Sequence, residues 1–142
     1  MKILVINGPN LNLLGIREPE IYGTETLEDI GNWLDTQPDA NGREITWFQS
    51  NHEGDLIDQI QSTIHLFDGL IINPGALTHY SYAIRDAISS VITPTVEVHL
   101  SDINSRDDFR KISVIKDECI SQISGLGKQG YLEALKTLIH YI

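Results

Sequence analysis

Short apolar runs recur along the chain, and segments with helical spacing lie between them. The runs are residues 3–6, 45–48, 70–72, 95–100 and 119–123. Strands of a parallel sheet are buried on both faces, so they read as continuous apolar runs rather than as an alternation of apolar and polar residues. Strands that alternate with helices along the chain predict an α/β protein with a parallel sheet.

Four apolar stripes recur at helical spacing, over residues 27–34, 56–64, 83–91 and 132–142. Thr24 or Thr26 can cap the first of these helices, and Asn51 precedes the second. A further short turn is expected over residues 106–110. The pattern predicts one domain over residues 1–142, with a flavodoxin-like, doubly wound five-stranded parallel sheet in a three-layer α/β/α arrangement.

The loop after the first apolar run is long and carries unusual chemistry. Residues 7–23 read NGPNLNLLGIREPEIYG, whereas loops between strands and helices usually have about 2–6 residues. Arg17 and Tyr22 lie five residues apart in it. A phenol has a pKa of ~10, so ionising it at pH 7 costs roughly 4 kcal/mol, and a nearby guanidinium can offset much of that. Tyr22 is therefore a candidate base, although residue types alone favour an aromatic packing anchor.

Polar and ionisable residues also follow the other strands. Right-handed crossovers place every strand-to-helix loop at the same edge of the sheet. These loops contain Asn10, Asn51, His52, Glu53, Asn73, Thr78, His79, Glu97, His99, Ser101, Arg106 and Arg110. Three of the five histidines and three of the five arginines thus fall at the edge where such folds bind ligands. This segregation predicts an active site at the carboxyl edge.

The tripeptide Glu97-Val98-His99 is the most informative pair of ionisable residues. Residues two apart in a strand share a face, so Glu97 and His99 point the same way and Val98 points to the core. A carboxylate beside an imidazole fixes its tautomer and favours the protonated form, which provides a proton donor near neutrality. A structural ion pair explains the same spacing. His52 and His79 can each cap the following helix or bind a ligand.

Composition and charge argue against several classes of function. The formal net charge is −10, which argues against nucleic acid as a partner because its phosphates require clustered basic residues. Cys119 is the only cysteine, so an intrachain disulfide is impossible and a buried structural thiol is expected. No apolar stretch suits a signal peptide or a membrane span, and we expect a cytoplasmic protein. Histidines and carboxylates lack metal-ligand spacing, so no metal is expected.

Two other functions of this fold are excluded by position. A phosphorelay receiver needs an aspartate at the end of the third strand, where Asn73 stands. A flavodoxin holds its flavin phosphate with a first loop rich in Ser and Thr, and the segment 7–23 has neither residue. No lysine lies at a strand end, which argues against a Schiff base.

Five blocks along nearly the whole chain resemble a known family. GPNLNLLGIREPEIYG, QSNHEGDLID, INPGALTHYSYAIRDA, VEVHLSDINSRDDFR and GLGKQGYLEAL are similar, in this order, to the type II 3-dehydroquinases. The resemblance implies a flavodoxin-like homo-oligomer, a dodecamer built of trimers, that uses no metal and no cofactor. It implies removal of water from 3-dehydroquinate to give 3-dehydroshikimate by anti elimination through an enolate. The reaction would serve the shikimate pathway or, alternatively, quinate catabolism.

The resemblance also implies catalytic roles and a lid over about residues 16–24. Tyr22 matches the base that takes the C2 proton, and Arg17 the lid residue that keeps it ionised. His99, held by Glu97, matches the acid that protonates the departing C1 hydroxyl. Asn10 matches a residue that binds a water placed to stabilise the enolate. This reverses the interpretation of Tyr22 as a packing anchor.

The remaining matches concern substrate binding. Asn73, His79 and Arg110 match contacts to substrate hydroxyls, Leu100 and Ser101 match the carboxylate pocket, and Asp86 matches a residue that reaches the substrate of a neighbouring subunit. Two positions depart from the family pattern: Leu77 stands where an aromatic residue is expected, and Ser105 where Ala is usual. Two other classes of function stay open on the residues alone. One is a non-enzymatic module that binds a small anion or flavin at the same edge. The other is a purely structural oligomer, which would leave the polar cluster at the carboxyl edge unexplained.

Overall fold

The five predicted strands form one parallel sheet. The computed structural model describes residues 1–105 and 107–142, and the side chains of Ile21, Tyr22 and Ser105 lie outside this description. The strands are β1 (Lys2–Asn7), β2 (Glu44–Gln49), β3 (Gly69–Asn73), β4 (Thr95–His99) and β5 (Ser121–Ser124). Their order is β2-β1-β3-β4-β5, with every pair parallel. This confirms the predicted flavodoxin-like sheet.

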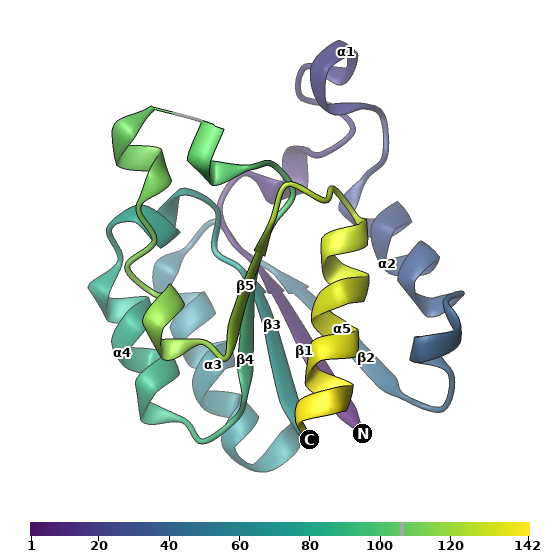
Figure 1. Cartoon of the computed structure of the whole chain (residues 1–142), viewed down its shortest axis with the longest axis vertical. Helices are drawn as coiled ribbons and strands as arrows, with labels where there is room; N and C mark the ends of the chain where they lie inside the picture. Colours follow the sequence, from purple (N-terminus) through teal and green to yellow (C-terminus); the bar gives the residue numbers. More distant parts are fainter. Residues whose placement is uncertain (106) are drawn as a thin grey trace.

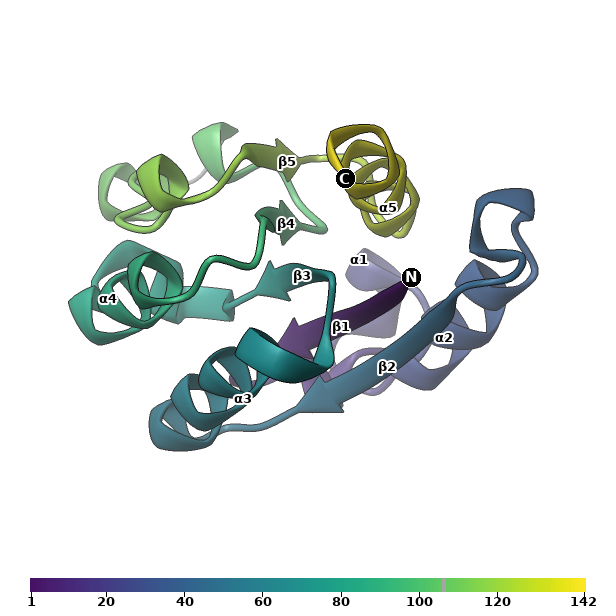
Figure 2. The ribbon, with the colours of Figure 1, turned by 90° about the horizontal axis from the view of Figure 1, so that it is seen from below.

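Four helices cover the sheet, two on each face (Figure 2). They are α2 (Leu27–Asp35), α3 (Glu53–Leu66), α4 (Tyr82–Ser90) and α5 (Gln129–Tyr141). Side chains of β1 alternate between the two layers: Ile3 and Val5 pack with α2 and α5, and Leu4 and Ile6 pack with α3 and α4. Burying each such side chain contributes about 1.5–3 kcal/mol. The predicted three layers are confirmed.

Short helices occupy the connections between these elements. They are η1 (Leu11–Leu13), α1 (Pro19–Tyr22), η2 (Pro38–Ala40), η3 (Gly75–His79), η4 (Ile103–Ser105), η5 (Asp108–Lys111) and η6 (Lys116–Glu118). On the short turn predicted over residues 106–110, the structure has η5, which begins at Asp108 and ends at Lys111, and Arg106 lies outside the described residues. The fifth strand begins at Ser121 rather than at Cys119 because Cys119 closes η6, with its N–H bonded to the Lys116 carbonyl at 3.1 Å. The fourth ends at His99 rather than at Leu100.

The start of α2 resolves an alternative that the sequence leaves open. Thr26 is the N-cap: its hydroxyl accepts from the Asp29 N–H at 3.1 Å, and the Asp29 carboxylate accepts from the Thr26 N–H at 3.0 Å. These two reciprocal hydrogen bonds satisfy two backbone N–H groups at the start of the helix that have no carbonyl partner within it. Asn51, which precedes α3, instead accepts from the Asn10 N–H at 2.9 Å.

The carboxyl edge of the sheet carries most of the irregular structure. In Figure 1 the two chain ends lie at the bottom of the sheet, and α1 projects beyond the opposite edge, where the strands end. The strand-to-helix loops therefore gather at one end of the molecule, as right-handed crossovers require.

No helix among the described residues is long and apolar enough to cross a membrane.

Gly8 allows the loops after β1 and β3 to touch. Its N–H donates to the Asn73 carbonyl at 2.8 Å. A Cβ added at Gly8 would lie 2.5 Å from the Pro74 carbonyl oxygen and 2.7 Å from its carbon. Both are rigid backbone atoms, so a side chain here requires the two loops to separate.

We therefore expect Gly8→Ala to lower the free energy of unfolding by about 1–3 kcal/mol, the usual cost of overpacking. Gly54→Ala is the matched control, because it lies in the first turn of α3 and an added Cβ there meets nothing within 4 Å. The control should be neutral or slightly stabilising, since Ala favours helix more than Gly. Urea denaturation followed by circular dichroism measures both, and equal midpoints for the two variants would contradict the argument.

Candidate active site

A pocket of about 350 Å³ opens at the carboxyl edge of the sheet. Its lining comes from the loops that follow β1, β3 and β4. The residues are Pro9, Asn10, Leu11, Leu13, Leu14, Arg17, Asn73, Gly75, Ala76, His79, His99, Leu100, Ser101, Ile103, Phe109 and Arg110. Elements distant in sequence thus meet at the edge that the sequence predicts for a ligand site.

Eight of the eleven predicted site residues line this pocket. They are Asn10, Arg17, Asn73, His79, His99, Leu100, Ser101 and Arg110. Glu97 lies behind His99, to which it is hydrogen-bonded. Asp86 lies on α4, is exposed, and does not line the pocket of its own chain. The Tyr22 side chain lies outside the described part of the structure.

Residues grouped with the site by loop position have other places. His52 is exposed at the start of α3 and makes no side-chain cap, and it is not among the lining residues. Thr78 is fully buried and donates to Glu97. Arg106 lies outside the described residues.

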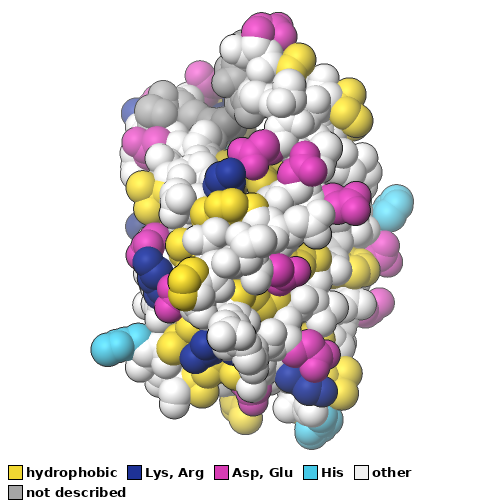
Figure 3. Space-filling view, turned by 90° about the vertical axis from the view of Figure 1, so that its right-hand side faces the viewer, with side chains coloured by type: hydrophobic (Ala, Val, Ile, Leu, Met, Phe, Trp, Pro, Cys, Tyr) yellow, Lys and Arg dark blue, Asp and Glu magenta, His cyan; other side chains and the backbone are white. Residues whose placement is uncertain are grey.

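The pocket has a positive character although the chain is acidic. Its described lining holds two arginines and two histidines and no carboxylate, against a net charge of −10 for the whole chain. Acidic side chains are scattered over the face of the molecule in Figure 3 rather than gathered. The local cations can therefore attract an anionic group against the overall field.

Glu97 and His99 form a buried pair at the end of β4. The His99 Nε2–H donates to Glu97 Oε1 at 2.6 Å, which leaves Nδ1 to serve the pocket. Glu97 is 0% exposed and His99 6%. Burial by itself raises the pKa of the Glu97 carboxyl, but hydrogen bonds from His99, Thr78 and Ser113, together with the attraction of His99, leave that pKa below its usual value. The pair can therefore hold a carboxylate beside an imidazole, as the spacing predicts, and Val98 packs in the core.

A second buried network holds Asn73. The Tyr131 hydroxyl donates to Asn7 Oδ1 at 2.5 Å, and Asn73 Nδ2 donates to the same hydroxyl at 3.3 Å. Asn73 Oδ1 accepts from the Gly75 N–H at 3.2 Å. Burial raises the pKa of the Tyr131 phenol, so it stays protonated and donates. The amide of Asn73 is thus fixed at the pocket wall.

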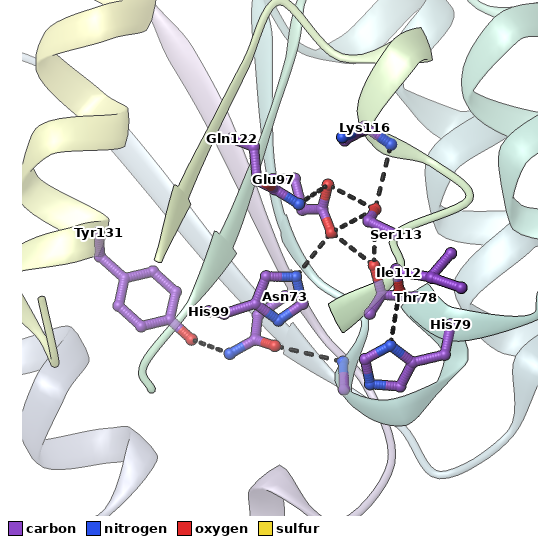
Figure 4. Close-up of polar contacts among 11 residues, drawn as sticks. Asn73, Thr78, His79, Glu97, His99, Ile112, Ser113, Lys116, Gln122 and Tyr131 are labelled. Carbon is purple, nitrogen blue, oxygen red and sulfur yellow. Dashed lines mark hydrogen bonds and ion pairs between the residues drawn. The ribbon is translucent and has the colours of Figure 1, made fainter. Parts of the chain in front are cut away.

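His79 is oriented by a backbone group. Its Nδ1 lies 2.7 Å from the Ile112 carbonyl oxygen (Figure 4). Because a carbonyl oxygen only accepts, Nδ1 donates, and Nε2 is the nitrogen left for a ligand. The Phe109 ring packs edge-on against the imidazole, with 6.0 Å between the two ring centres. The Arg110 guanidinium lies 5.2 Å from the centre of the Phe109 ring. These contacts fix the side of the pocket formed by η5.

Asn10 lines the pocket from the long loop that follows β1. Its φ of 71° lies in the left-handed region, which asparagine adopts more readily than most residues with a side chain. Its N–H is held by Asn51 Oδ1. Asn10 is thereby kept at the mouth of the loop that carries Arg17.

Three residues that support the site carry no signal in the sequence. Tyr131, Ser113 and Gln122 contact Asn73 or Glu97 from segments far along the chain. Each looks like an ordinary polar residue beside an apolar run. No group of three or more His, Cys, Asp or Glu side chains among the described residues is arranged to hold a metal ion. Cys119 is half-buried, and burial raises the pKa of its thiol to about 12.

Comparisons with known proteins point to one family. The family model described as "Dehydroquinase class II" matches residues 1–139. The chain is 54% identical over 139 residues to the 3-dehydroquinate dehydratase of Clostridium beijerinckii, covering 97% of this chain and 95% of the relative. The crystal structure of a type II dehydroquinase from Butyrivibrio crossotus superposes with a TM-score of 0.92 at 52% identity, covering 98% and 97% of the two chains. One from Propionibacterium acnes gives 0.91 at 39% identity, covering 98% and 96%.

The Tyr131 network yields a test of stability. Tyr131→Phe removes the hydroxyl that joins Asn7 to Asn73, so Asn7 Oδ1 and Asn73 Nδ2 each lose a buried hydrogen bond. We expect the free energy of unfolding to fall by about 1–3 kcal/mol. Tyr141→Phe, at an exposed tyrosine of the same helix, should change it by less than about 0.5 kcal/mol. Denaturant titrations of the two variants and the wild type measure these changes in the free energy of unfolding. Indistinguishable curves for Tyr131→Phe and the wild type would mean that water replaces the hydroxyl.

Proposed function

Because the chain belongs to the class II dehydroquinase family, we propose that it converts 3-dehydroquinate to 3-dehydroshikimate, with Tyr22 as base and His99 as acid. As a member of this family the chain is a hydro-lyase, a type II 3-dehydroquinate dehydratase. The elimination is anti and passes through an enolate. The observation that carries this proposal is the buried Glu97–His99 pair, which presents one imidazole nitrogen to a pocket with cationic walls.

His99 supplies the proton for the leaving group. Its Nε2 is occupied by Glu97, so the proton goes from Nδ1 to the C1 hydroxyl, which departs as water. The negative Glu97 stabilises the imidazolium before the transfer and holds the ring in one orientation. A positioned acid of this kind contributes about 10²–10⁴-fold to the rate.

Tyr22 takes the C2 proton as a phenolate, and Arg17 keeps it ionised. The proposal is supported by Arg17, which lines the pocket on the loop that leads to α1 and Tyr22. The loss of the C2 proton forms the enolate, and a water held by Asn10 stabilises its oxygen. Residues 16–24 act as the lid that brings the phenol to the substrate.

The other lining residues bind the substrate. Asn73, His79 and Arg110 contact its hydroxyl groups, and Leu100 and Ser101 hold its carboxylate. The fixed amide of Asn73 and the oriented ring of His79 support these roles. Such contacts let an acidic protein bind a carboxylate.

Asp86 contributes to the site of a neighbouring subunit. Its exposed position on α4, outside the pocket of its own chain, supports this role. The assembly proposed is a dodecamer built of trimers, in which each chain is a single catalytic domain located in the cytoplasm. The reaction feeds aromatic biosynthesis by the shikimate pathway, and quinate catabolism would use the same chemistry.

The direct test mixes the purified protein with 3-dehydroquinate and follows the ultraviolet absorbance of the conjugated enone in the product. A rise that survives a metal chelator is expected. A flat trace from folded, assembled protein would overturn the assigned reaction. Visible colour in the purified protein would instead favour a flavin-binding module.

Two substitutions test the acid and the base. We expect Tyr22→Phe and His99→Ala each to lower kcat by at least about 10²-fold, since each removes a proton-transfer group. Tyr141→Phe and His140→Ala are controls at exposed positions of α5 and should keep wild-type turnover. Near-native turnover by Tyr22→Phe would remove the base assignment, and the same result for His99→Ala would remove the acid.

Arg17→Ala separates two roles of the guanidinium. If Arg17 sustains the phenolate, the substitution lowers kcat more than it raises KM. Steady-state kinetics across a series of pH values measure both, and partial recovery of kcat at high pH is expected because the phenol then ionises without help. A rise in KM with unchanged kcat would make Arg17 a substrate clamp.

A further inference from the structure

The buried Glu97 carboxylate is surrounded by hydrogen-bond donors from several elements (Figure 4). Besides His99, it accepts from Thr78 Oγ1 at 2.5 Å, from Ser113 Oγ at 2.8 and 2.9 Å, and from Gln122 Nε2 at 3.1 Å. Thr78 lies in η3, Ser113 between η5 and η6, and Gln122 in β5. A carboxylate shielded from water keeps its charge only where donors replace the lost hydration.

Ser113 occupies the centre of this network. It is the donor that reaches both carboxylate oxygens, and its own oxygen accepts from the Lys116 N–H at 3.2 Å. A hydroxyl has a single hydrogen. The Thr78 hydroxyl, 3.1 Å from Ser113 Oγ, gives its own hydrogen to Glu97. Because an ionised carboxylate only accepts, the Ser113 hydrogen also goes to Glu97.

The segment that carries Ser113 is docked on His79 and Thr78 of η3. The preceding carbonyl, of Ile112, accepts from His79, and the following N–H, of Val114, donates to the Thr78 carbonyl at 2.8 Å. Arg85 of α4 donates to the Val114 carbonyl at 2.7 Å. The position of Ser113 is thus fixed by backbone groups on both sides.

Few titratable groups face Glu97. Among the described residues they are His99 on its own strand and Cys119 at the end of η6, whose raised pKa keeps it a neutral thiol. Arg85, on the neighbouring helix, pairs with Glu118 at 2.9 Å rather than with Glu97. Among the titratable groups of the described residues, His99 is therefore the one with which the Glu97 carboxylate forms an ion pair when the imidazole is protonated.

We propose that Ser113 is a positioning residue, which fixes the Glu97 carboxylate in charge and orientation and through it aligns the His99 imidazole for proton transfer. This rests on the proposed role of His99 as the acid. Ser113 does not line the pocket, so its effect on the reaction is indirect. A substitution at this position changes the chemical step and leaves substrate affinity nearly unchanged.

The kinetic test uses Ser113→Ala, with Ser62→Ala as the matched control. The Ser62 hydroxyl also makes one short hydrogen bond, to the Gln59 carbonyl within α3, away from the pocket. We expect Ser113→Ala to lower kcat about tenfold with KM changed less than about twofold, as for the loss of one charge-assisted hydrogen bond. Ser113→Thr retains the hydroxyl and should restore most of the turnover.

A double-mutant cycle distinguishes positioning from a general structural effect. In a His99→Ala background, Ser113→Ala should cost almost nothing further, because no imidazole remains to be aligned. Multiplying losses would overturn the proposal, and so would wild-type kcat in the Ser113→Ala variant. If Ser113→Ala fails to fold, Ser113→Cys, which keeps the shape with a weaker donor, takes its place in the cycle.

A second readout is independent of turnover. In protein labelled with ¹⁵N-histidine, the His99 Nε2–H should give a downfield proton resonance, assigned by its absence from His99→Ala. Ser113→Ala should shift it upfield and accelerate its exchange with water, and Ser113→Thr should restore it. An unchanged resonance overturns the proposal even if the wild type lacks dehydratase activity. An inactive wild type with the expected shifts would overturn the assigned reaction alone.

Discussion

A negative charge without access to water is the constraint on which the site depends. Glu97 is fully buried at the end of β4, where an isolated carboxylate would be costly. It is tolerated because four side chains donate to it. The donors come from β4, η3, β5 and the segment before η6, so these parts of the chain must be in place together. The same network that stabilises the charge orients His99.

The parallel topology provides the setting for this network. Every strand leaves the sheet at the same edge, and the close contact at Gly8 brings the loops after β1 and β3 together. Polar groups that would be unfavourable in the core are concentrated there and pair with one another. The pocket is lined by arginine and histidine, and its described lining includes no carboxylate.

Much of the fold and part of the site could be read from local patterns. Apolar runs predicted all five strands, and the period of two in Glu97-Val98-His99 predicted a shared face, which the 2.6 Å contact confirms. The blocks of family resemblance predicted eight residues that the structure brings to one pocket. The predicted start of the fifth strand was wrong because Cys119 ends the short 3₁₀ helix η6, so that the strand begins at Ser121.

The fold class, the family and the edge of the sheet where the functional residues gather all follow from the amino-acid sequence, because they depend on periodicity and on contiguous motifs. Only the tertiary structure revealed the supports of Asn73 and Glu97. Ser113 and Gln122 lie 16 and 25 residues from Glu97, and Tyr131 lies 58 residues from Asn73. A hydrogen bond across such separations leaves no spacing pattern. It exists because the packed sheet brings the partners together, and the cost of burying unpaired polar groups keeps them there.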